Sequence, residues 1–144
     1  MGARTSGREA ALQMLFALET SGRTPEQVIA WFWRDVAPDA ADPGLTPESR
    51  AYADEAVQGV AHELERIDAA IRAASTNWRL ERMARVDRNV LRLGVWELSS
   101  RPEVPRAVAL DEAVELAKRF GSEDSGAFVN GVLDRVAEDL GRTA

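Results

Sequence analysis

The sequence holds few side chains that could carry out catalytic or metal chemistry. Its 144 residues include no cysteine and a single histidine, His62. The lack of cysteine excludes disulfides, thiolate nucleophiles and cysteine-bearing zinc sites. One histidine in a polar helical stretch, with no second imidazole at a metal-binding spacing, is typical of an ordinary surface residue. We therefore expect no catalytic triad, no metal and no cofactor.

Two other kinds of side chain could bind a partner. Arg85, Arg88 and Arg92 recur at intervals of three and four residues, which places them on one face of a helix. Phe16 and Phe128 fall at the edges of the apolar arcs of their helices. Arginines neutralise phosphates, and aromatic rings at a rim stack on RNA bases or hold partner loops. The same pattern also fits rings at the rim of the core and arginines paired with acids, and periodicity leaves both readings open.

The charge is unevenly distributed along the chain. The net charge is -6, which argues against broad attraction to nucleic acid. Residues 81–106 reverse this balance with six arginines against four acids, so any contact with phosphates must be local. No apolar run approaches the roughly 20 residues of a membrane span, and no complete secretory signal is present, so we expect a cytoplasmic protein.

Helices must position these side chains, because every periodic segment repeats at about 3.6 residues and no alternating strand pattern occurs. Threonine before proline at positions 24 and 46 marks two helix starts. Glycine or proline marks several of the ends. The expected helices span about residues 6–19, 24–37, 46–60, 64–74, 82–100, 106–120 and 122–140.

These elements predict an all-α fold of about seven helices. Residues 39–44, with Pro43, are expected to form a loop. A polar break near residues 75–80 divides the chain into an N-terminal half of about residues 5–75 and a C-terminal half of about 80–140. Because each half is small, we expect a single domain over residues 1–144.

Three stretches of the sequence carry a specific pattern of residues. The longest is E-A-V-E-L-A-K-R-F-G-S-E-D-S-G-A-F-V-N-G-V-L-D, from Glu112 to Asp134. The others are R-E-A-A-L-Q-M-L-F-A-L-E from Arg8 to Glu19, and V-D-R-N-V-L-R-L-G-V-W-E-L-S from Val86 to Ser99. In order and spacing these stretches closely resemble the NusB family of bacterial transcription antitermination factors, and the likeness covers nearly the whole chain.

The resemblance implies both a fold and a function. It implies a helical bundle of two packed three-helix subdomains. It also implies a factor that binds the boxA element of nascent RNA together with NusE, a ribosomal small-subunit protein. Such a pair helps RNA polymerase in its antitermination complex to read through terminators, particularly in ribosomal RNA operons. The resemblance implies no catalysis, and it leaves open whether the free protein is a monomer or a homodimer.

Carried over position by position, the resemblance implies an RNA surface. Many relatives have a denser arginine cluster at the N-terminus than the R-T-S-G-R of this chain, so we expect weaker RNA binding without NusE. The carboxylate of Asp124 is expected to oppose phosphate while favouring a helix N-terminus. The implied RNA-binding residues are Arg4, Arg8, Lys118, Arg119, Asp124, Ser125 and Phe128.

The resemblance also implies a surface for NusE. Relatives often have tyrosine at the position of Phe16 and glutamate at that of Asp87, so single hydrogen bonds of this surface differ here. Two further features are expected to be structural, an internal ion pair of Glu97 and a close helix crossing at Gly131. The implied NusE-binding residues are Phe16, Glu81, Asp87, Arg88 and Arg92.

Two alternatives follow from the same residues. The sparse N-terminal arginines also fit a helical protein–protein adaptor with little RNA affinity of its own. A NusB-like domain also precedes some RNA cytosine methyltransferases, but this sequence has no cysteine for the methyltransferase nucleophile. We therefore expect a binding protein rather than an enzyme.

Overall fold

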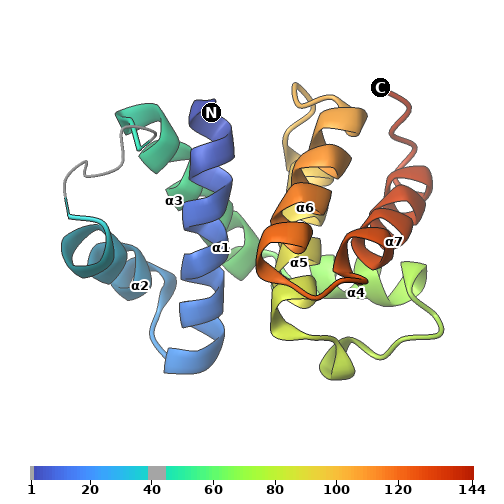
Figure 1. Ribbon diagram of the computed structural model, residues 1–144, viewed down its shortest axis with the longest axis horizontal. Helices are drawn as coiled ribbons and strands as arrows, with labels where there is room; N and C mark the ends of the chain where they lie inside the picture. Colours follow the sequence, from blue (N-terminus) through green and yellow to red (C-terminus); the bar gives the residue numbers. More distant parts are fainter. Residues whose placement is uncertain (1, 39–44) are drawn as a thin grey trace. The chain divides into compact units, whose positions relative to one another are not determined.

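The computed structural model describes residues 2–38 and 45–144, and over these ranges the chain is helical with no strand. The predicted all-α class is confirmed, and the loop predicted at residues 39–44 lies outside the described residues. Figure 1 shows the path of the chain. The elements are α1 (Ala3–Ser21), α2 (Pro25–Trp31), the π-helical turn η1 (Phe32–Val36), α3 (Pro47–His62), α4 (Leu64–Ala74), the 3-10 turn η2 (Leu80–Arg82), α5 (Arg85–Ser100), α6 (Arg106–Phe120) and α7 (Ser125–Asp139).

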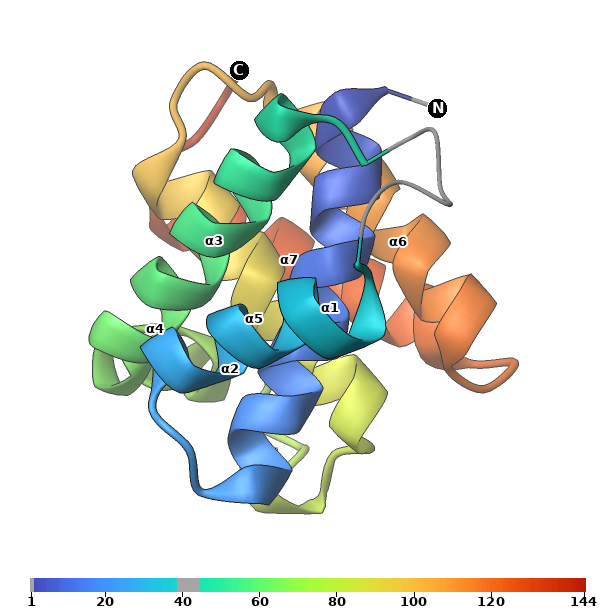
Figure 2. The same cartoon turned by 90° about the vertical axis from the view of Figure 1, so that its left-hand side faces the viewer.

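The chain divides into two compact units, one ending at His62 and the other beginning at Glu63. In the first unit α1 packs along α3, and α2 contacts both of them. Figure 2 shows α2 crossing in front of α1. The side chains that fill this unit are fully or almost fully buried. They include Met14, Leu15, Val28, Phe32, Tyr52, Val57 and Val60.

The second unit is built around α5, which contacts α4, α6 and α7. Ten consecutive positions of α5 from Asn89 to Leu98 are buried or nearly so, because neighbours cover the helix on several sides. Helix α7 also packs on α4 and α6. The core of this unit includes Ile67, Ile71, Val90, Leu91, Val95, Leu98, Val129 and Leu133.

The boundary between the units differs from the predicted one at residues 75–80. Helix α4 belongs to the second unit because Ile67 and Ile71, both 0% exposed, face α5 and α7. The chain turns instead at Glu63, whose φ of -112° and ψ of 26° interrupt the helix for a single residue. The second unit therefore contains four α-helices rather than three.

Several helix ends also differ from the predicted ones. Thr24 and Gln27 form a reciprocal capping box at the start of α2, as the threonine signal predicts. However, α2 ends at Trp31 and continues as a π-helical turn. Helices α5 and α7 begin three residues later than expected, since residues 80–82 form a 3-10 turn and Ser122 lies in the turn before α7.

The expected close helix crossing lies at Gly94 and not at Gly131. A Cβ at Gly94 would lie 2.6 Å from Leu133 Cδ1, whereas a Cβ at Gly131 would meet nothing within 4 Å. Gly131 is exposed on α7, and Gly94 is buried on α5. The absence of a side chain at Gly94 therefore allows α5 and α7 to approach closely.

The two glycines provide a matched test of this packing. Gly94→Ala is expected to lower the free energy of unfolding by about 1–3 kcal/mol, because the fully buried Leu133 has no room to move away. Gly131→Ala is expected to raise it by about 0.5–1 kcal/mol, because alanine favours an exposed helix interior. Urea unfolding of both variants measures the difference, and equal effects would contradict the close crossing.

Candidate functional site

Two aromatic rings from distant parts of the second unit meet at the start of α7. The ring centroids of Trp78 and Phe128 lie 5.9 Å apart with an interplanar angle of 77°. Trp78 is 64% exposed, and Phe128 is partly exposed. Phe128 is therefore a rim residue whose ring is accessible. Sequence reasoning missed Trp78 because it lies in a polar break without helical period, where the only signal is a lone indole beside arginine.

Two cations lie at the end of α6, next to this turn of α7. Lys118 and Arg119 are both exposed. The stem of Lys118 passes Gly126 of α7, where an added Cβ would lie 3.1 Å from Lys118 Cγ. The guanidinium of Arg119 lies 5.0 Å from the ring centroid of Phe120, which is itself 44% exposed. Both predicted cations therefore reach the surface, and the basic group and apolar ring of this helix end are presented together.

Two neighbouring predicted RNA-binding residues at the turn between α6 and α7 differ in their exposure to solvent. Asp124 is exposed at the N-cap of α7. Ser125 is only 1% exposed, and its Oγ accepts a hydrogen bond of 2.9 Å from the backbone N–H of Ser122. Ser125 is therefore not exposed in the free chain, because its hydroxyl closes the turn, and its contact with RNA stays a prediction. The turn also requires glycine at position 121, where a Cβ would lie 2.5 Å from Ser125 Oγ.

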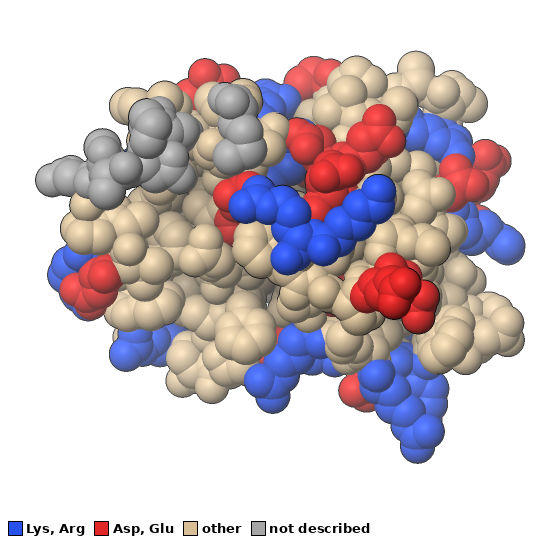
Figure 3. Space-filling view, in the orientation of Figure 1, with Lys and Arg blue, Asp and Glu red and all other residues tan. Residues whose placement is uncertain are grey.

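Basic and acidic side chains alternate over this unit. Figure 3 shows red and blue side chains lying next to one another over the part that contains α6 and α7, with no wide basic area on that face. This mixture agrees with the negative net charge of -6. A polyanion would therefore meet a few local cations rather than a broad positive surface.

The two N-terminal arginines lie in the first unit, on the ring of Tyr52. The guanidinium of Arg4 lies 4.7 Å from the ring centroid, and that of Arg8 lies 5.6 Å from it. Arg4 is partly exposed, but Arg8 is only 3% exposed. The burial of Arg8 does not favour the expected contact with phosphate, because the side chain packs inside this unit, and that contact stays a prediction. Stacking on an aromatic face lets an arginine be buried at a lower cost than burial without any partner.

The arginine stripe of α5 is also largely engaged. The Arg92 Nε and Nη2 groups donate to the two carboxylate oxygens of Asp68 on α4, at 2.9 and 3.0 Å. Arg88 Nη1 donates to the carbonyl oxygens of Leu80 and Met83, both at 3.3 Å. Of the two readings that the periodicity left open, Arg88 and Arg92 follow the one in which the arginines are engaged with neighbouring groups, and their part in binding NusE stays a prediction. They position α4 and η2.

Two acids predicted at the partner surface differ in their surroundings. Glu81 is exposed in η2, and its pKa lies below the ordinary value because its own backbone N–H and the guanidinium of Arg72 stabilise the carboxylate. Asp87, in the first turn of α5, is 9% exposed, and its Oδ1 has no hydrogen-bond partner among the described residues. The Oδ1 of Asp87 therefore retains the capacity to accept a hydrogen bond.

Phe16 is exposed, as its place outside the apolar arc predicts. Its side chain is 44% accessible on α1, although the neighbouring Met14 and Leu15 are buried. The following turn is anchored by Thr20, whose hydroxyl donates to the Phe16 carbonyl oxygen at 3.0 Å. Phe16 therefore presents an apolar side chain at the surface of α1.

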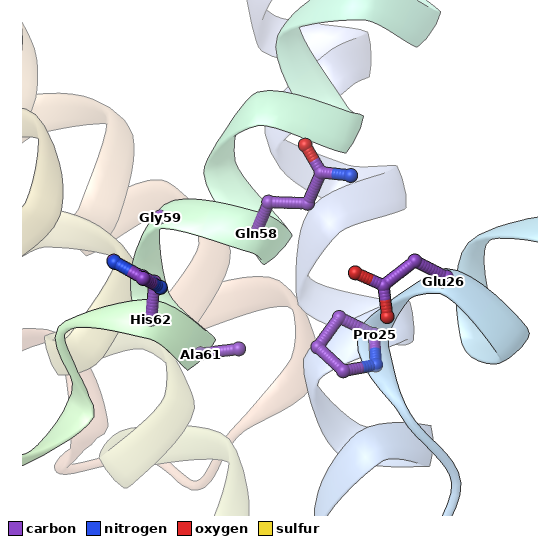
Figure 4. Close-up of a pocket in the computed structure, with 6 residues that line it drawn as sticks. All are labelled: Pro25, Glu26, Gln58, Gly59, Ala61 and His62. Carbon is purple, nitrogen blue, oxygen red and sulfur yellow. The ribbon is translucent and has the colours of Figure 1, made fainter.

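The rest of the described chain offers no catalytic or metal centre. His62 is exposed, as expected, and lines an open depression of about 500 Å³ between the start of α2 and the end of α3. In Figure 4 its imidazole points away from Glu26, the carboxylate of that depression. The described residues contain no group of three potential metal ligands. None of their helices is long and apolar enough to cross a membrane.

Comparison with known proteins identifies relatives of this chain. The profile of the NusB family matches residues 5–138. The chain belongs to the NusB family. The transcription antitermination protein NusB of Sorangium cellulosum is 71% identical over 142 residues, which cover 99% of this chain and 96% of the relative. The NusB of Myxococcus xanthus is 49% identical over 144 residues, which cover 99% of each chain.

Solved NusB structures share the fold. NusB of T. maritima aligns with a TM-score of 0.82 at 35% identity, covering 94% of this chain and 91% of the other. A structure of the antitermination factors NusB and NusE in complex with dsRNA aligns with a TM-score of 0.78 at 26% identity, covering 95% and 97%. The resemblance found in three sequence stretches is thus confirmed, and NusB is a family of transcription antitermination proteins rather than of enzymes.

The ion pair between α4 and α5 can be tested by removing one charge. Asp68→Asn is expected to lower the free energy of unfolding by about 2–4 kcal/mol, because it leaves Arg92 poorly compensated where the two side chains are only 13% and 11% exposed. The control is Asp139→Asn, which breaks the Arg135–Asp139 pair at 65% and 45% exposure. That change is expected to alter stability by less than about 0.5 kcal/mol. Urea unfolding that ranks the two variants equally would contradict a stabilising role for Asp68.

Proposed function

We propose that this chain is an antitermination factor that binds boxA-type RNA together with NusE and promotes read-through by RNA polymerase, particularly in ribosomal RNA operons. It acts in the cytoplasm without a cofactor. The proposal is supported by membership of the NusB family and by the similarity to a solved complex described as NusB and NusE with dsRNA.

The observation that carries the RNA part is the accessibility of the predicted side chains on α6 and α7. Phe128 on α7 offers a ring, and Lys118 and Arg119 at the end of α6 offer two exposed cations. An accessible ring and exposed cations are the kinds of side chain that bind unstacked bases and their phosphates. Because only a few cations are involved, binding is expected to weaken with salt along a shallow slope.

The NusE part is supported by a different set of groups. Phe16 presents an apolar ring on α1, Glu81 presents a carboxylate in η2, and Asp87 keeps an unused acceptor. Arg88 and Arg92 contribute to this surface by holding η2 and α4 in place rather than through free guanidinium groups. Arg4 remains a candidate for RNA because it is partly exposed.

The burial of Arg8 favours one alternative function. It removes one of only two N-terminal cations from the surface, so the chain alone offers little charge for RNA there. An adaptor that binds NusE but has negligible RNA affinity is consistent with this observation. The salt-dependent RNA titration described next separates the two functions.

The deciding experiment titrates labelled boxA-type RNA, single-stranded and as a duplex, into the protein with and without NusE. We expect single-stranded RNA to bind more tightly when NusE is present, with lower affinity at higher salt. Phe128→Ala is expected to weaken RNA binding about tenfold and to leave NusE binding unchanged. RNA binding that is absent at every salt concentration would favour the adaptor, and equal loss of both partners would mean that Phe128 is only a core residue.

The NusE surface is tested by placing a charge at an exposed ring. Phe16→Asp is expected to weaken NusE binding at least tenfold, because a buried carboxylate without a partner opposes association. Val36→Asp is the matched control, since Val36 is also 44% exposed and lies in the first unit. Calorimetric titration of NusE into each variant measures the effect. An affinity for Phe16→Asp equal to that of Val36→Asp would remove Phe16 from the interface.

A further inference from the structure

The exposed ring of Trp78 is not explained by packing. It is the most exposed large hydrophobic side chain among the described residues, at 64%, and its one aromatic neighbour is Phe128. We propose that Trp78 is a second stacking platform for the RNA strand, beside Phe128, so that the two rings hold two different bases. This inference rests on the proposed RNA-binding function and names a further binding residue for it.

The backbone around Trp78 is held in a defined conformation. The Trp78 N–H donates to the Ser75 carbonyl oxygen at 2.9 Å, and the buried Ser75 hydroxyl donates to the Ile71 carbonyl oxygen at 2.7 Å. On the other side, Arg88 binds the carbonyl oxygens of Leu80 and Met83. The indole is therefore presented by a turn fixed at both ends, which lowers the entropy lost when a base stacks on it.

The charges next to the indole favour a polyanion. Arg79 and Arg82 are both exposed. The acid between them, Glu81, forms an exposed ion pair with Arg72, in which Arg72 Nη2 lies 3.1 Å from Glu81 Oε1, and Arg79 also stabilises this carboxylate electrostatically. The turn from Ser122 to Asp124, just before α7, carries acids that repel phosphates. The arginines that follow Trp78 in the sequence are therefore expected to attract the phosphates of an RNA strand more strongly than this turn does.

The angle between the two rings indicates what kind of RNA fits. At 77° the rings are nearly perpendicular, so a single flat base cannot lie against the faces of both. In the proposed site each ring stacks on its own base, so the two bases must be tilted against one another. Paired bases in a helix are parallel and covered by their neighbours, so the site requires an unpaired strand.

The test compares Trp78 variants with a matched control in the same unit. Trp78→Ala is expected to weaken binding of single-stranded boxA-type RNA to the protein–NusE complex about tenfold. Trp78→Phe is expected to restore it to within about threefold, because an aromatic face remains. Val108→Ala removes another exposed apolar side chain, 42% accessible, and is expected to bind like the unchanged protein.

A second measurement detects the stacking directly. Single-stranded RNA is expected to quench tryptophan fluorescence of the unchanged protein, and this quenching is expected to be lost in Trp78→Phe, although Trp31, Trp33 and Trp96 remain. Duplex RNA of the same sequence is expected to quench much less. Circular dichroism checks that each variant is folded, and NusE titration measures its partner binding separately.

Three results would overturn the inference. One is RNA affinity of Trp78→Ala equal to that of Val108→Ala while Phe128→Ala is impaired, which leaves the proposed function intact. Another is loss of NusE binding in Trp78→Ala with unchanged RNA binding by the protein alone, which would assign the indole to a protein interface. The third is no RNA binding by the complex of the unchanged protein with NusE, in which case the proposed function fails as well.

Discussion

The ion pair between Asp68 and Arg92 is the contact on which the candidate surface of the second unit depends. It is bidentate and largely buried, and it joins α4 to α5. Ile67 and Ile71 pack on the same side of α4 and bury it against α5 and α7. Because α4 is held there, the segment that follows it is directed along α7, and Trp78 reaches Phe128. The ion pair and the buried isoleucines of α4 thus act together to place Trp78 beside Phe128.

Much of the fold could be predicted from the sequence because helical period and capping residues are local properties. The bounds of α6, from Arg106 to Phe120, agree with the prediction, since proline precedes the helix and glycine follows it. The boundary between the units could not be predicted in the same way. It lies at Glu63, where no glycine or proline marks the change, and it depends on which helix the buried isoleucines of α4 contact.

The exposure of the candidate residues could be predicted for some of them and not for others. Phe16, Lys118 and Arg119 project from regular helices, so their angular position indicates that they face solvent. Arg8, Ser125 and Arg92 could not be assigned, because an arginine or serine on a helix surface is accessible only if no partner covers it. Tyr52, Ser122 and Asp68 are those partners, and each is distant in the sequence or hidden in a turn.

The contact between Trp78 and Phe128 joins two segments that are far apart in the chain and meet only after α4 through α7 have assembled. A ligand held between these segments recognises the native unit and not its unfolded form. Association and folding of this unit are then coupled, and the ligand contributes to its thermal resistance in proportion to the logarithm of its free concentration. A short peptide cut from either segment would lack the contact between the two rings.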